Sequence, residues 1–562
     1  MLFKLLVRVL IIPLFLCVIN ECIAQVDTSL VSMSKYPTKK VKLSAEELKA
    51  WHMKDYQADT IPGISLEKLY NSGLIKGEGE TIIVAVLDTK LDIHHEDLIN
   101  QIWTNDDEIA NNGIDDDNNG YIDDVNGWDF INSSDDDTVQ FTSMEVSRII
   151  RVYGPLYENR DSSALNASEL EEFNLYKKAL KEHEGYVEEY QSLVDYFKNW
   201  KIEYYQADSI VKNYLGKEAY NLSSLDSLSD SIIDSTLIKE VDFLKSNIEY
   251  NNTLEEMESY AKLYEGVVKI CLDVNHNDRA MLGDDPNNLT DSNYGYGKVW
   301  GEVLFEHSIA VTGVIASERN NNLGTKGFAD NIRIMPVVMV AMGDEHDKDV
   351  ALAIRYAVDN GARVINMSWG KVFSLHQDWV LDAMKYAAKH DVLLVTGAGN
   401  DHVDTDEKIF FPTDNRDEIE LIDNLIVVGA SSYESNKNLI AYFSNYGRRN
   451  VDVFAPGEEI YSTESNNKYG FADGTSIASP LVAGLAALLR SHFPEFRAEE
   501  IKDIILDSGI YYDLPVIIYD EDYNEELRNF NELSKTGSIV NAFNAFLLAK
   551  ERYDNRYSKT RK

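Results

Sequence analysis

Short apolar segments alternate with amphipathic segments along most of this chain, and this alternation restricts its fold more than any other feature. Residues 81–88 (TIIVAVLD) are continuously apolar and end in a carboxylate, as expected of a buried strand. Similar segments are Ile332–Val340, Val364–Trp369, Val392–Thr396, Leu425–Ser431 and Val451–Ala455. Helical patterns lie between them, at Asp347–Asn360 and Gln377–Lys389. This order predicts an α/β fold, a three-layer sandwich with a mainly parallel sheet and helices on both faces.

The carboxyl ends of these strands indicate where a functional site lies. In open parallel sheets, ligands bind just beyond the carboxyl ends of the strands. Asp88, Trp369–Gly370 and Gly397–Asn400 all fall at such ends. These residues are therefore the first candidates for the site.

Residues 141–290 have a different pattern, and Met144–Ile270 in particular predicts helices. Apolar and aromatic residues recur there at helical spacing among many Glu and Lys: Phe173, Tyr176, Leu180, Val187, Tyr190, Val194 and Phe197. The Ser/Asp-rich stretch Ser223–Asp234 is predicted to be a loop. The simplest interpretation is a helical hairpin packed against the main domain. The alternative is a subdomain that restricts substrates or binds a partner.

The first residues have the pattern of an export signal. Lys4 and Arg8 precede or flank the apolar run Val9–Ile19, and Cys22–Ala24 offers a small-x-small cleavage site. That run is too short to span a membrane, and no second run approaches the required length. We therefore expect an exported protein, secreted, periplasmic or at the cell surface, without an integral membrane span after signal removal. A lipid anchor is left open, and the mature chain keeps only Cys271.

The formal net charge of −42 argues against two classes of partner. A surface this acidic repels the phosphates of nucleic acids and of anionic membranes. Part of the acidic excess lies in compact Asp/Asn runs, which suggests cation binding.

The run Gly474–Pro480 (GTSIASP) places Ser476 at the start of an apolar helix. The first four N–H groups of a helix have no intrahelical acceptor, so a serine there has hydrogen-bond donors beside its hydroxyl. Pro480 is tolerated near the first turn. Taken alone, the run is equally compatible with an ordinary capped helix.

Ser476 follows two further candidates in the order Asp88, His307, Ser476. A serine hydroxyl needs a histidine to take its proton, and that imidazole needs a carboxylate to orient it. This order is the one found in subtilisin. With the residues around it, the chain resembles the subtilisin-like serine peptidases (subtilases). The motifs that carry the resemblance are VAVLDT at 84–89, HSIAVTGVIA at 307–316, NMSWG at 366–370, VTGAGN at 395–400, FSNYG at 443–447, APG at 455–457 and GTSIASP at 474–480.

The resemblance implies a secreted serine endopeptidase that acts through an Asp88-His307-Ser476 triad and an acyl-enzyme. It implies that Asn400 donates to the oxyanion and that substrate binds along two segments, Ser368-Trp369-Gly370 and Gly397-Ala398-Gly399. Substrates are then polypeptides, and no organic cofactor is expected. The alternative is a weak or inactive subtilase-fold protein that binds polypeptides. An esterase or lipase is disfavoured because no Gly-x-Ser-x-Gly sequence surrounds Ser476.

The resemblance also sets the expected domain organisation. The segments are a signal peptide at 1–24, an N-terminal extension at 25–75, the first part of the catalytic domain at 76–140, the helical insertion at 141–290, the second part of the catalytic domain at 291–550 and a basic tail at 551–562.

Two positions depart from the family pattern near the predicted triad. Lys90 stands where the family has glycine, and residues two apart on a strand share a face. Lys90 is therefore expected near Asp88, where it either keeps that carboxylate ionised or competes with His307 for it. Ser308-Ile309-Ala310 replaces Gly-Thr-His, so the surroundings of His307 must be repacked.

The acidic segment 112–124 (NGIDDDNNGYIDD) has oxygen ligands at alternate positions followed by glycine, as in EF-hand-like loops. The predicted structural calcium ligands are Asp115, Asp117, Asn119, the Tyr121 carbonyl, and Asp123 or Asp124. The glutamate that usually closes such loops is absent, and a solvated acidic turn is the alternative. A second, weaker candidate comprises Asp273, Asn275, Asn277 and Asp278.

Overall fold

The computed structural model describes residues 42–134, 139–229, 235–249, 252–301, 306–416, 418–520 and 523–558. Within these ranges the chain divides into two compact units, one holding residues up to Gln140 and from Arg279 onward, the other Phe141–Asp278. The predicted signal at 1–24 and the last residues of the tail lie outside the described residues. Every helix in the described ranges is too short or too polar to cross a bilayer.

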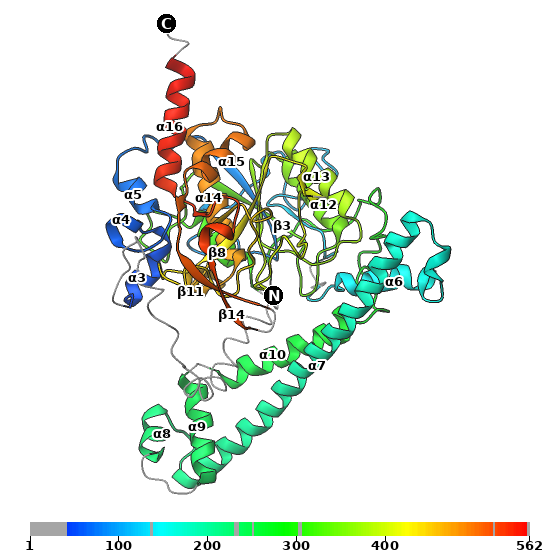
Figure 1. The fold of residues 1–562 in the computed structure, drawn as a ribbon, viewed down its shortest axis with the longest axis vertical. Helices are drawn as coiled ribbons and strands as arrows, with labels where there is room; N and C mark the ends of the chain where they lie inside the picture. The colour runs from blue at the N-terminus through cyan, green and yellow to red at the C-terminus, as the bar shows by residue number, and fades with distance from the viewer. Residues whose placement is uncertain are drawn as a thin grey trace. The chain divides into compact units, whose positions relative to one another are not determined.

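The first unit is built on one large, mainly parallel sheet (Figure 1). Over the described residues it has nine strands in the order β12-β15-β9-β8-β5-β4-β1-β3-β2. Their bounds are β1 Ile82–Asp88, β2 Trp128–Asp129, β3 Ile332–Val338, β4 Val364–Met367, β5 Leu393–Gly397, β8 Leu425–Ser431, β9 Val453–Pro456, β12 Ile510–Tyr511 and β15 Ser538–Ile539. Of these pairings, the one between β12 and β15 is antiparallel and the rest are parallel. The predicted fold class is confirmed.

The two faces of the sheet support two separate hydrophobic cores. Along β1, Val84 and Val86 point into one core and Ala85 and Leu87 into the other, because side chains alternate along a strand. The first core is shared with α11 (Ser308–Ala316) and α14 (Thr475–His492), and the second with α12 (Asp347–Asp359) and α13 (Gln377–Lys389). Strands buried on both faces are continuously apolar, which explains the sequence pattern.

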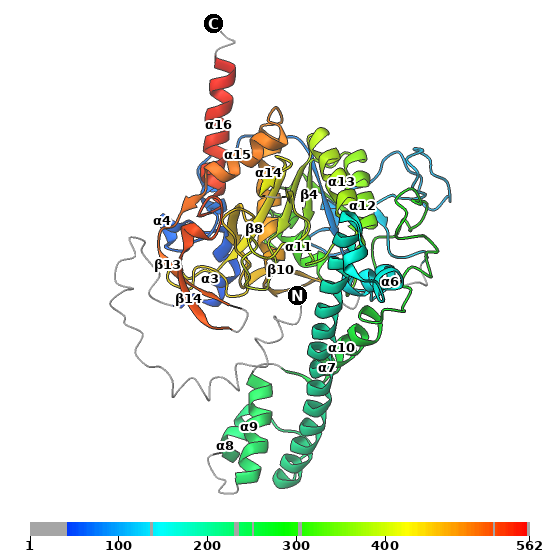
Figure 2. The same ribbon diagram turned by 45° about the vertical axis from the view of Figure 1, so that its right-hand side comes forward.

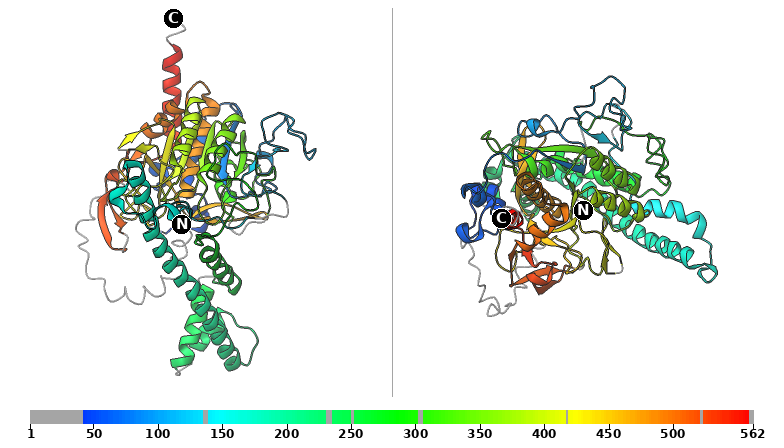
Figure 3. Two further views of the ribbon diagram at one scale, coloured as in Figure 1. Left: turned by 90° about the vertical axis from the view of Figure 1, so that its right-hand side faces the viewer. Right: turned by 90° about the horizontal axis from the view of Figure 1, so that it is seen from above.

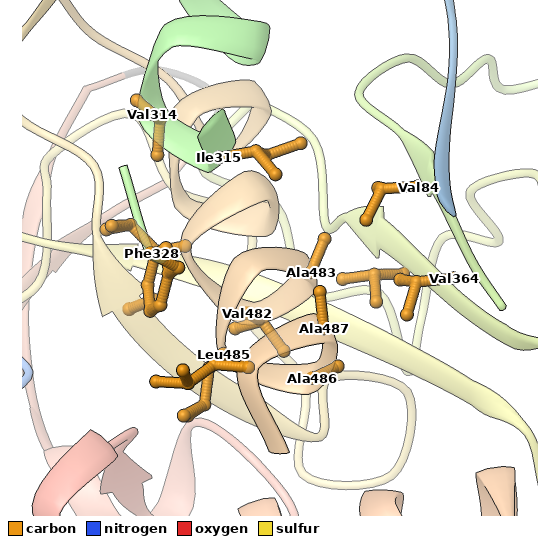
Figure 4. Close-up of a cluster of buried hydrophobic side chains, with 14 of the residues drawn as sticks. Val84, Val314, Ile315, Phe328, Val364, Val482, Ala483, Leu485, Ala486 and Ala487 are labelled. Carbon is orange, nitrogen blue, oxygen red and sulfur yellow. The ribbon is translucent and has the colours of Figure 1, made fainter. Parts of the chain in front are cut away.

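Helix α14 is the most deeply buried of these helices. All its residues from Thr475 to Ser491 are buried. Figure 4 shows Ala483 and Ala487 on the side of the helix that faces Val84 and Val364 of the sheet, with Ile315 and Phe328 packed beside the helix. Small side chains on α14 let the helix lie close to the strands. Gly484 has no room for a larger residue, since an added Cβ would lie 2.2 Å from the Phe328 ring.

The segment that precedes the first strand is an integral part of the first unit. Its helices are α3 Ala45–Ala50, η1 Trp51–Met53, α4 Tyr56–Asp59 and α5 Leu66–Asn71. Trp51 is fully buried in the first core, and its indole Nε1 donates to the carbonyls of Glu458 and Glu459 at 3.1 Å. The Ala542 amide, at the start of α16 (Ala542–Ser558), donates to the Ile64 carbonyl at 2.7 Å.

The remaining elements of the first unit are short or peripheral, and Figure 3 shows them around the central strands. They are η2 Ile99–Gln101, β6 Asn415–Arg416, β7 Ile419–Glu420, β10 Ile460–Glu464, β11 Lys468–Ala472, α15 Ala498–Asp507, β13 Pro515–Tyr519, β14 Glu525–Asn529 and η5 Phe530–Glu532. The hairpin of β10 and β11 packs on α11, because Ser462 and Thr463 donate to carbonyls of that helix at 2.7 Å.

The second unit is helical, as the spacing of its apolar residues predicts (Figure 2). Its elements are α6 Glu145–Tyr157, η3 Ser162–Ala164, α7 Ala167–Leu215, α8 Leu222–Ser229, α9 Ser235–Glu249, α10 Leu254–Gly266 and the π-helical turn η4 Val267–Cys271. The 49-residue α7 begins at a capping box of Asn166 and Glu169 and ends at Gly216 with a positive φ of 62°. Its aromatic seam packs on α10, where Phe197 stacks on Tyr264.

The loop predicted at Ser223–Asp234 is wrong over its first part. Residues up to 229 form α8, and 230–234 lie outside the described residues. Leu225 and Leu228, three positions apart, bury their side chains against Val241 and Leu244 of α9. This apolar spacing, and not the serine content, determined the local structure.

The burial of Trp51 yields a test of how far the N-terminal segment supports the fold. Trp51→Ala removes a fully buried ring and two hydrogen bonds, so we expect a loss of about 3–5 kcal/mol in the free energy of unfolding. Urea unfolding followed by far-ultraviolet circular dichroism measures it. Leu527→Ala, at a side chain that is 53% exposed, is the control and should change stability by less than about 0.5 kcal/mol. Equal midpoints for the two variants would contradict this prediction.

Candidate active site

Asp88 and His307 form a hydrogen-bonded pair at the end of β1. Asp88 is the last residue of the strand and is buried, while His307 is the N-cap of α11. The His307 Nδ1 atom lies 2.9 Å from both carboxylate oxygens of Asp88. The Thr89 amide also donates to Asp88 Oδ1 at 2.7 Å, which fixes the orientation of the carboxylate.

The surroundings of His307 favour its protonated form. Burial lowers the pKa of the imidazole, but the charge of Asp88 and its hydrogen bond raise it, and the charge of Glu345 adds to the rise. The net pKa lies above the ordinary value of 6.5. An imidazole that is oriented through Nδ1 and stabilised as a cation is suited to accept a proton at Nε2.

Lys90 forms an ion pair with Asp129, so the prediction that it competes with His307 for Asp88 is wrong, and its effect on the ionisation of Asp88 stays a prediction. Its ammonium lies 3.6 Å from Asp129 Oδ2, and both side chains are buried. Burial raises the pKa of Asp129 to about 6, although the charge of Lys90 and hydrogen bonds from Ile131 and Asn132 act to lower it. The lysine therefore forms its ion pair with Asp129, while the Asp88 carboxylate binds His307.

Ser308 explains how the changed sequence after His307 is accommodated. Its hydroxyl donates to the Lys90 carbonyl at 2.6 Å, and its amide donates to Thr89 Oγ1 at 3.2 Å. These two bonds attach the start of α11 to the residues that follow Asp88. The repacking expected around His307 thus ties the histidine helix to the aspartate strand.

Ser476 lies in the first turn of α14, as the sequence predicts. Helix α14 packs against α11, the helix that His307 caps. Gly474, the N-cap of α14, has a φ of 140°, a conformation that favours glycine. An added Cβ there would lie 3.6 Å from Ser476 Oγ, 3.5 Å from the Ser476 amide nitrogen and 3.6 Å from Asn400 Nδ2. A hydroxyl and two N–H donors therefore converge on one small space.

Thr475 holds Asn400 in that arrangement. Asn400 Oδ1 accepts from the Thr475 amide at 2.8 Å and from its hydroxyl at 3.0 Å. With its oxygen engaged in this way, the Asn400 amide directs its NH₂ group toward the space beside Ser476. Thr475 Oγ1 also accepts from the Gly399 amide at 3.1 Å, so one side chain fixes both residues. Thr475 belongs to the GTSIASP motif, but nothing in the sequence indicates that its side chain orients Asn400.

Asn445 fixes the same loop from its other side. Its Nδ2 donates to the Ala398 carbonyl at 2.9 Å, and its Oδ1 accepts from the amides of Asp401 and Val403. Its own amide donates to the Gly399 carbonyl at 2.9 Å. The FSNYG motif therefore clamps the segment that carries Asn400.

The two segments expected to bind substrate flank Ser476. Ser368 is buried, and its hydroxyl donates to the Ser476 carbonyl at 2.7 Å while it accepts from Asn366. Trp369 is also buried, and its Nε1 donates to the Leu87 carbonyl at 2.9 Å. On the other side, an added Cβ at Gly397 would lie 2.9 Å from the Thr475 carbonyl oxygen. The side chains of Ser368 and Trp369 thus brace the site, and substrate binding by the two segments stays a prediction.

Three carboxylates in and before the acidic loop lie close together, but the carboxylates of the loop do not all converge. Carboxylate oxygens of Glu108, Asp115 and Asp117 lie within 4.8 Å of one another. Asp123 instead accepts from the amides of Asn112 and Gly113. Glu108 was missed because it lies outside the repeating pattern, seven residues before Asp115.

Two further carboxylates that the sequence predicts as cation ligands, Asp124 and Asp278, form hydrogen bonds or ion pairs with other protein groups. Asp124 is fully buried and accepts from the Tyr356 hydroxyl at 2.7 Å and from the side-chain NH₂ groups of Asn105 and Asn119. In the second unit, Asp278 accepts from the Ser143 amide and pairs with Arg151 at 3.8 Å.

Comparisons with known proteins identify a family and several relatives. The sequence model described as "Subtilase family" matches residues 79–532. A thermophilic serine proteinase from Bacillus sp. (strain AK1) is 40% identical over 215 residues, which make up 37% of this chain and 50% of that protein. Subtilisin DY from Bacillus licheniformis is 29% identical over 245 residues, 43% of this chain and 82% of that protein.

A solved structure of a protease from Pseudoalteromonas arctica PAMC 21717 aligns with a TM-score of 0.35 and 26% identity, covering 43% of this chain and 70% of that one. The chain spans about half the length of the thermophilic proteinase.

The pair of Asp88 and His307 predicts a measurable change in one pKa. Asp88→Asn removes the negative charge, so burial should dominate and the pKa of His307 should fall. Because the folded-state pKa is raised in the wild type, the pair stabilises the fold below pH 6.5, and this stabilisation is lost as the pH rises through the folded pKa. Nuclear magnetic resonance of ¹³C-labelled histidine rings follows the titration.

His492 is the internal control for this titration. Burial lowers its pKa, and it should titrate identically in both proteins. An unchanged or higher pKa for His307 in Asp88→Asn would refute the assignment of Asp88 as the group that raises it.

Proposed function

Because this chain belongs to the subtilase family, we propose that it is a serine endopeptidase that hydrolyses peptide bonds through an acyl-enzyme on Ser476. The observation that carries the proposal is the Asp88–His307 pair, with His307 Nδ1 at 2.9 Å from both carboxylate oxygens. This contact sets the tautomer of the imidazole, so that Nε2 is the atom that exchanges protons with the serine.

The reaction follows from these three side chains. Ser476 Oγ attacks the carbonyl carbon of the substrate while its proton passes to His307 Nε2. The imidazolium then gives that proton to the departing amine, and the peptide C–N bond breaks. A water molecule attacks the resulting ester in the same way, which releases the acid and restores Ser476. Asp88 stabilises the imidazolium in both halves.

The oxyanion of each tetrahedral intermediate would lie in the space beside Gly474. The Asn400 side chain and the Ser476 amide both aim at that space, and donors placed where charge develops stabilise the transition state. Glycine at position 474, which the φ of 140° favours, places no side chain in that space.

The alternative, a polypeptide-binding protein without activity, is not favoured by these contacts. Asp88, His307, Asn400 and Ser476 are all present, and Asn400 and His307 are held by specific hydrogen bonds. The departures at Lys90 and Ser308 leave those bonds intact.

A secreted chain fits the remaining features. Substrates would be polypeptides, and export would depend on the apolar run near the N-terminus. The part of the chain that the structure describes holds one cysteine, Cys271, and therefore no internal disulfide, so the fold there would gain stability from a bound cation. Calcium is the cation that three clustered carboxylates fit, because it prefers hard oxygen ligands, and Glu108, Asp115 and Asp117 would hold it.

The proposed activity is tested with a fluorophosphonate probe. The wild type should label and should cleave peptides, and Ser476→Ala should do neither. Asn400→Ala should still label but should lose about 10²–10³ in kcat, the loss known from removal of the equivalent donor in subtilisin itself. The control is Asn438→Ala, at an exposed amide away from Ser476. A folded wild type that neither labels nor cleaves would refute the proposal.

The proposed cation site is tested by thermal unfolding with and without calcium. A ligand present at 100 times its Kd stabilises the folded state by about 2.7 kcal/mol, so chelation should lower the Tm of the wild type. Asp117→Asn should remove most of that difference. Asp106→Asn, at an exposed carboxylate outside the cluster, should retain it. A wild-type Tm independent of calcium would contradict the site.

A further inference from the structure

We infer that Phe410 fills the pocket for the substrate side chain next to the scissile bond, and that the enzyme therefore prefers small residues there. That residue, P1, lies on the acyl side of the bond that is cut. The inference rests on the proposed function and adds a substrate preference to it. None of the motifs of the sequence includes Phe410.

The pocket is identified by its two walls. One wall is the segment that ends at Gly370, and the other is the segment that ends at Gly399. Ser368, two residues before Gly370, donates to the Ser476 carbonyl, and Asn400 directly follows Gly399. Each wall therefore lies next to a residue that contacts the first turn of α14: Ser368 contacts Ser476, and Asn400 contacts Thr475. A P1 side chain, attached one atom from the carbonyl under attack, would enter the gap between them.

The ring of Phe410 lies against both walls. An added Cβ at Gly370 would lie 2.3 Å from Phe410 Cε1 and 2.9 Å from its Cζ. At Gly399 the corresponding distances are 3.1 Å to Cε1 and 2.9 Å to Cζ. The same edge of one ring is thus in contact with the backbone of both segments. The glycines admit the ring, and the ring occupies the gap.

The backbone around Phe410 is anchored to one of the walls. The Lys371 amide donates to the Phe411 carbonyl at 3.0 Å, and the Phe411 amide donates to the Lys371 carbonyl at 2.7 Å. Lys371 is itself held by Asp347, whose Oδ1 lies 2.9 Å from its ammonium, with both side chains buried. This pairing fixes the backbone that carries Phe410 beside the segment that ends at Gly370.

The contrast with Trp369 supports the assignment. Trp369 is larger and lies in the wall itself, yet its indole is turned to the Leu87 carbonyl beneath the sheet end. The Trp369 ring therefore packs in the interior, and the ring that fills the pocket is Phe410, from the loop that pairs with Lys371. A methyl group at P1 needs little of the space that Phe410 takes, whereas a benzyl group needs all of it.

The experiment compares peptide p-nitroanilides with alanine or phenylalanine at P1. The wild type should prefer alanine in kcat/KM. Phe410→Ala should raise kcat/KM for phenylalanine relative to alanine by roughly 10- to 200-fold, the range typical of pocket-shape discrimination. Phe410→Leu, a milder change in volume, should shift the same ratio in the same direction by less. Both variants are checked by their unfolding midpoints.

The matched control is Ile409→Ala, at the neighbouring side chain, which is 59% exposed. This substitution truncates an exposed side chain next to Phe410 on the same loop, and it should leave the P1 ratio unchanged. A wild type that already cleaves after phenylalanine as well as after alanine would overturn this inference and leave the proposed function standing. An unchanged ratio in folded Phe410→Leu would also overturn it. A folded wild type that cleaves neither series and is not labelled by the fluorophosphonate probe refutes the proposed function, and the preference falls with it. A wild type that is labelled but cleaves neither series overturns only the preference.

Discussion

The burial of α14 is the constraint on which the rest of the site depends. This helix lies against β1, β4, β5, β8 and β9 and against α11, and its residues from Thr475 to Ser491 are buried. Because its small side chains allow close packing, the position of its first turn is set by the whole first core. Ser476 inherits that position. For the proposed reaction this matters, because a serine on a buried helix terminus is held more firmly than one on a loop, and an oriented attack requires a fixed nucleophile.

Parallel pairing of β1, β4 and β5 then brings the other predicted site residues to the same edge of the sheet as Ser476. In β1, β4 and β5 the strands run in one direction, so Asp88, Ser368 and the segment ending at Asn400 emerge together. The registers place Asn366 of β4 beside Val86 of β1 and Val395 of β5. At this edge, hydrogen bonds fix the side chains of Asp88, Ser368 and Asn400. The sheet supplies the placement, and Thr475 and Asn445 supply the orientation of the Asn400 loop.

Much of this arrangement could be predicted from the sequence because it resides in local patterns. Buried parallel strands are continuous apolar runs, and the motifs around Asp88, His307 and Ser476 occur in a recognisable order. Glu108 and Phe410 could not be found in this way. Each lies in a loop without periodicity. Glu108 lies before the repeating pattern that contains Asp115 and Asp117, and the Phe410 ring meets Gly370 and Gly399, which come from other segments. The loop predicted after Ser223 failed because composition was given more weight than the spacing of leucines.

Lys90 shows how a departure from a family pattern is absorbed by residues that no motif includes. A buried ammonium without a partner would be costly, and Asp129 provides the opposite charge. Gly301 lies beside the lysine stem, since an added Cβ there would be in van der Waals contact with Lys90 Cδ at 3.7 Å. Ser308 uses the Lys90 carbonyl to hold the start of α11. The Lys90 ammonium thus pairs with Asp129, while the Lys90 carbonyl accepts from Ser308 next to His307. The substitution is therefore compatible with an intact Asp88–His307 pair.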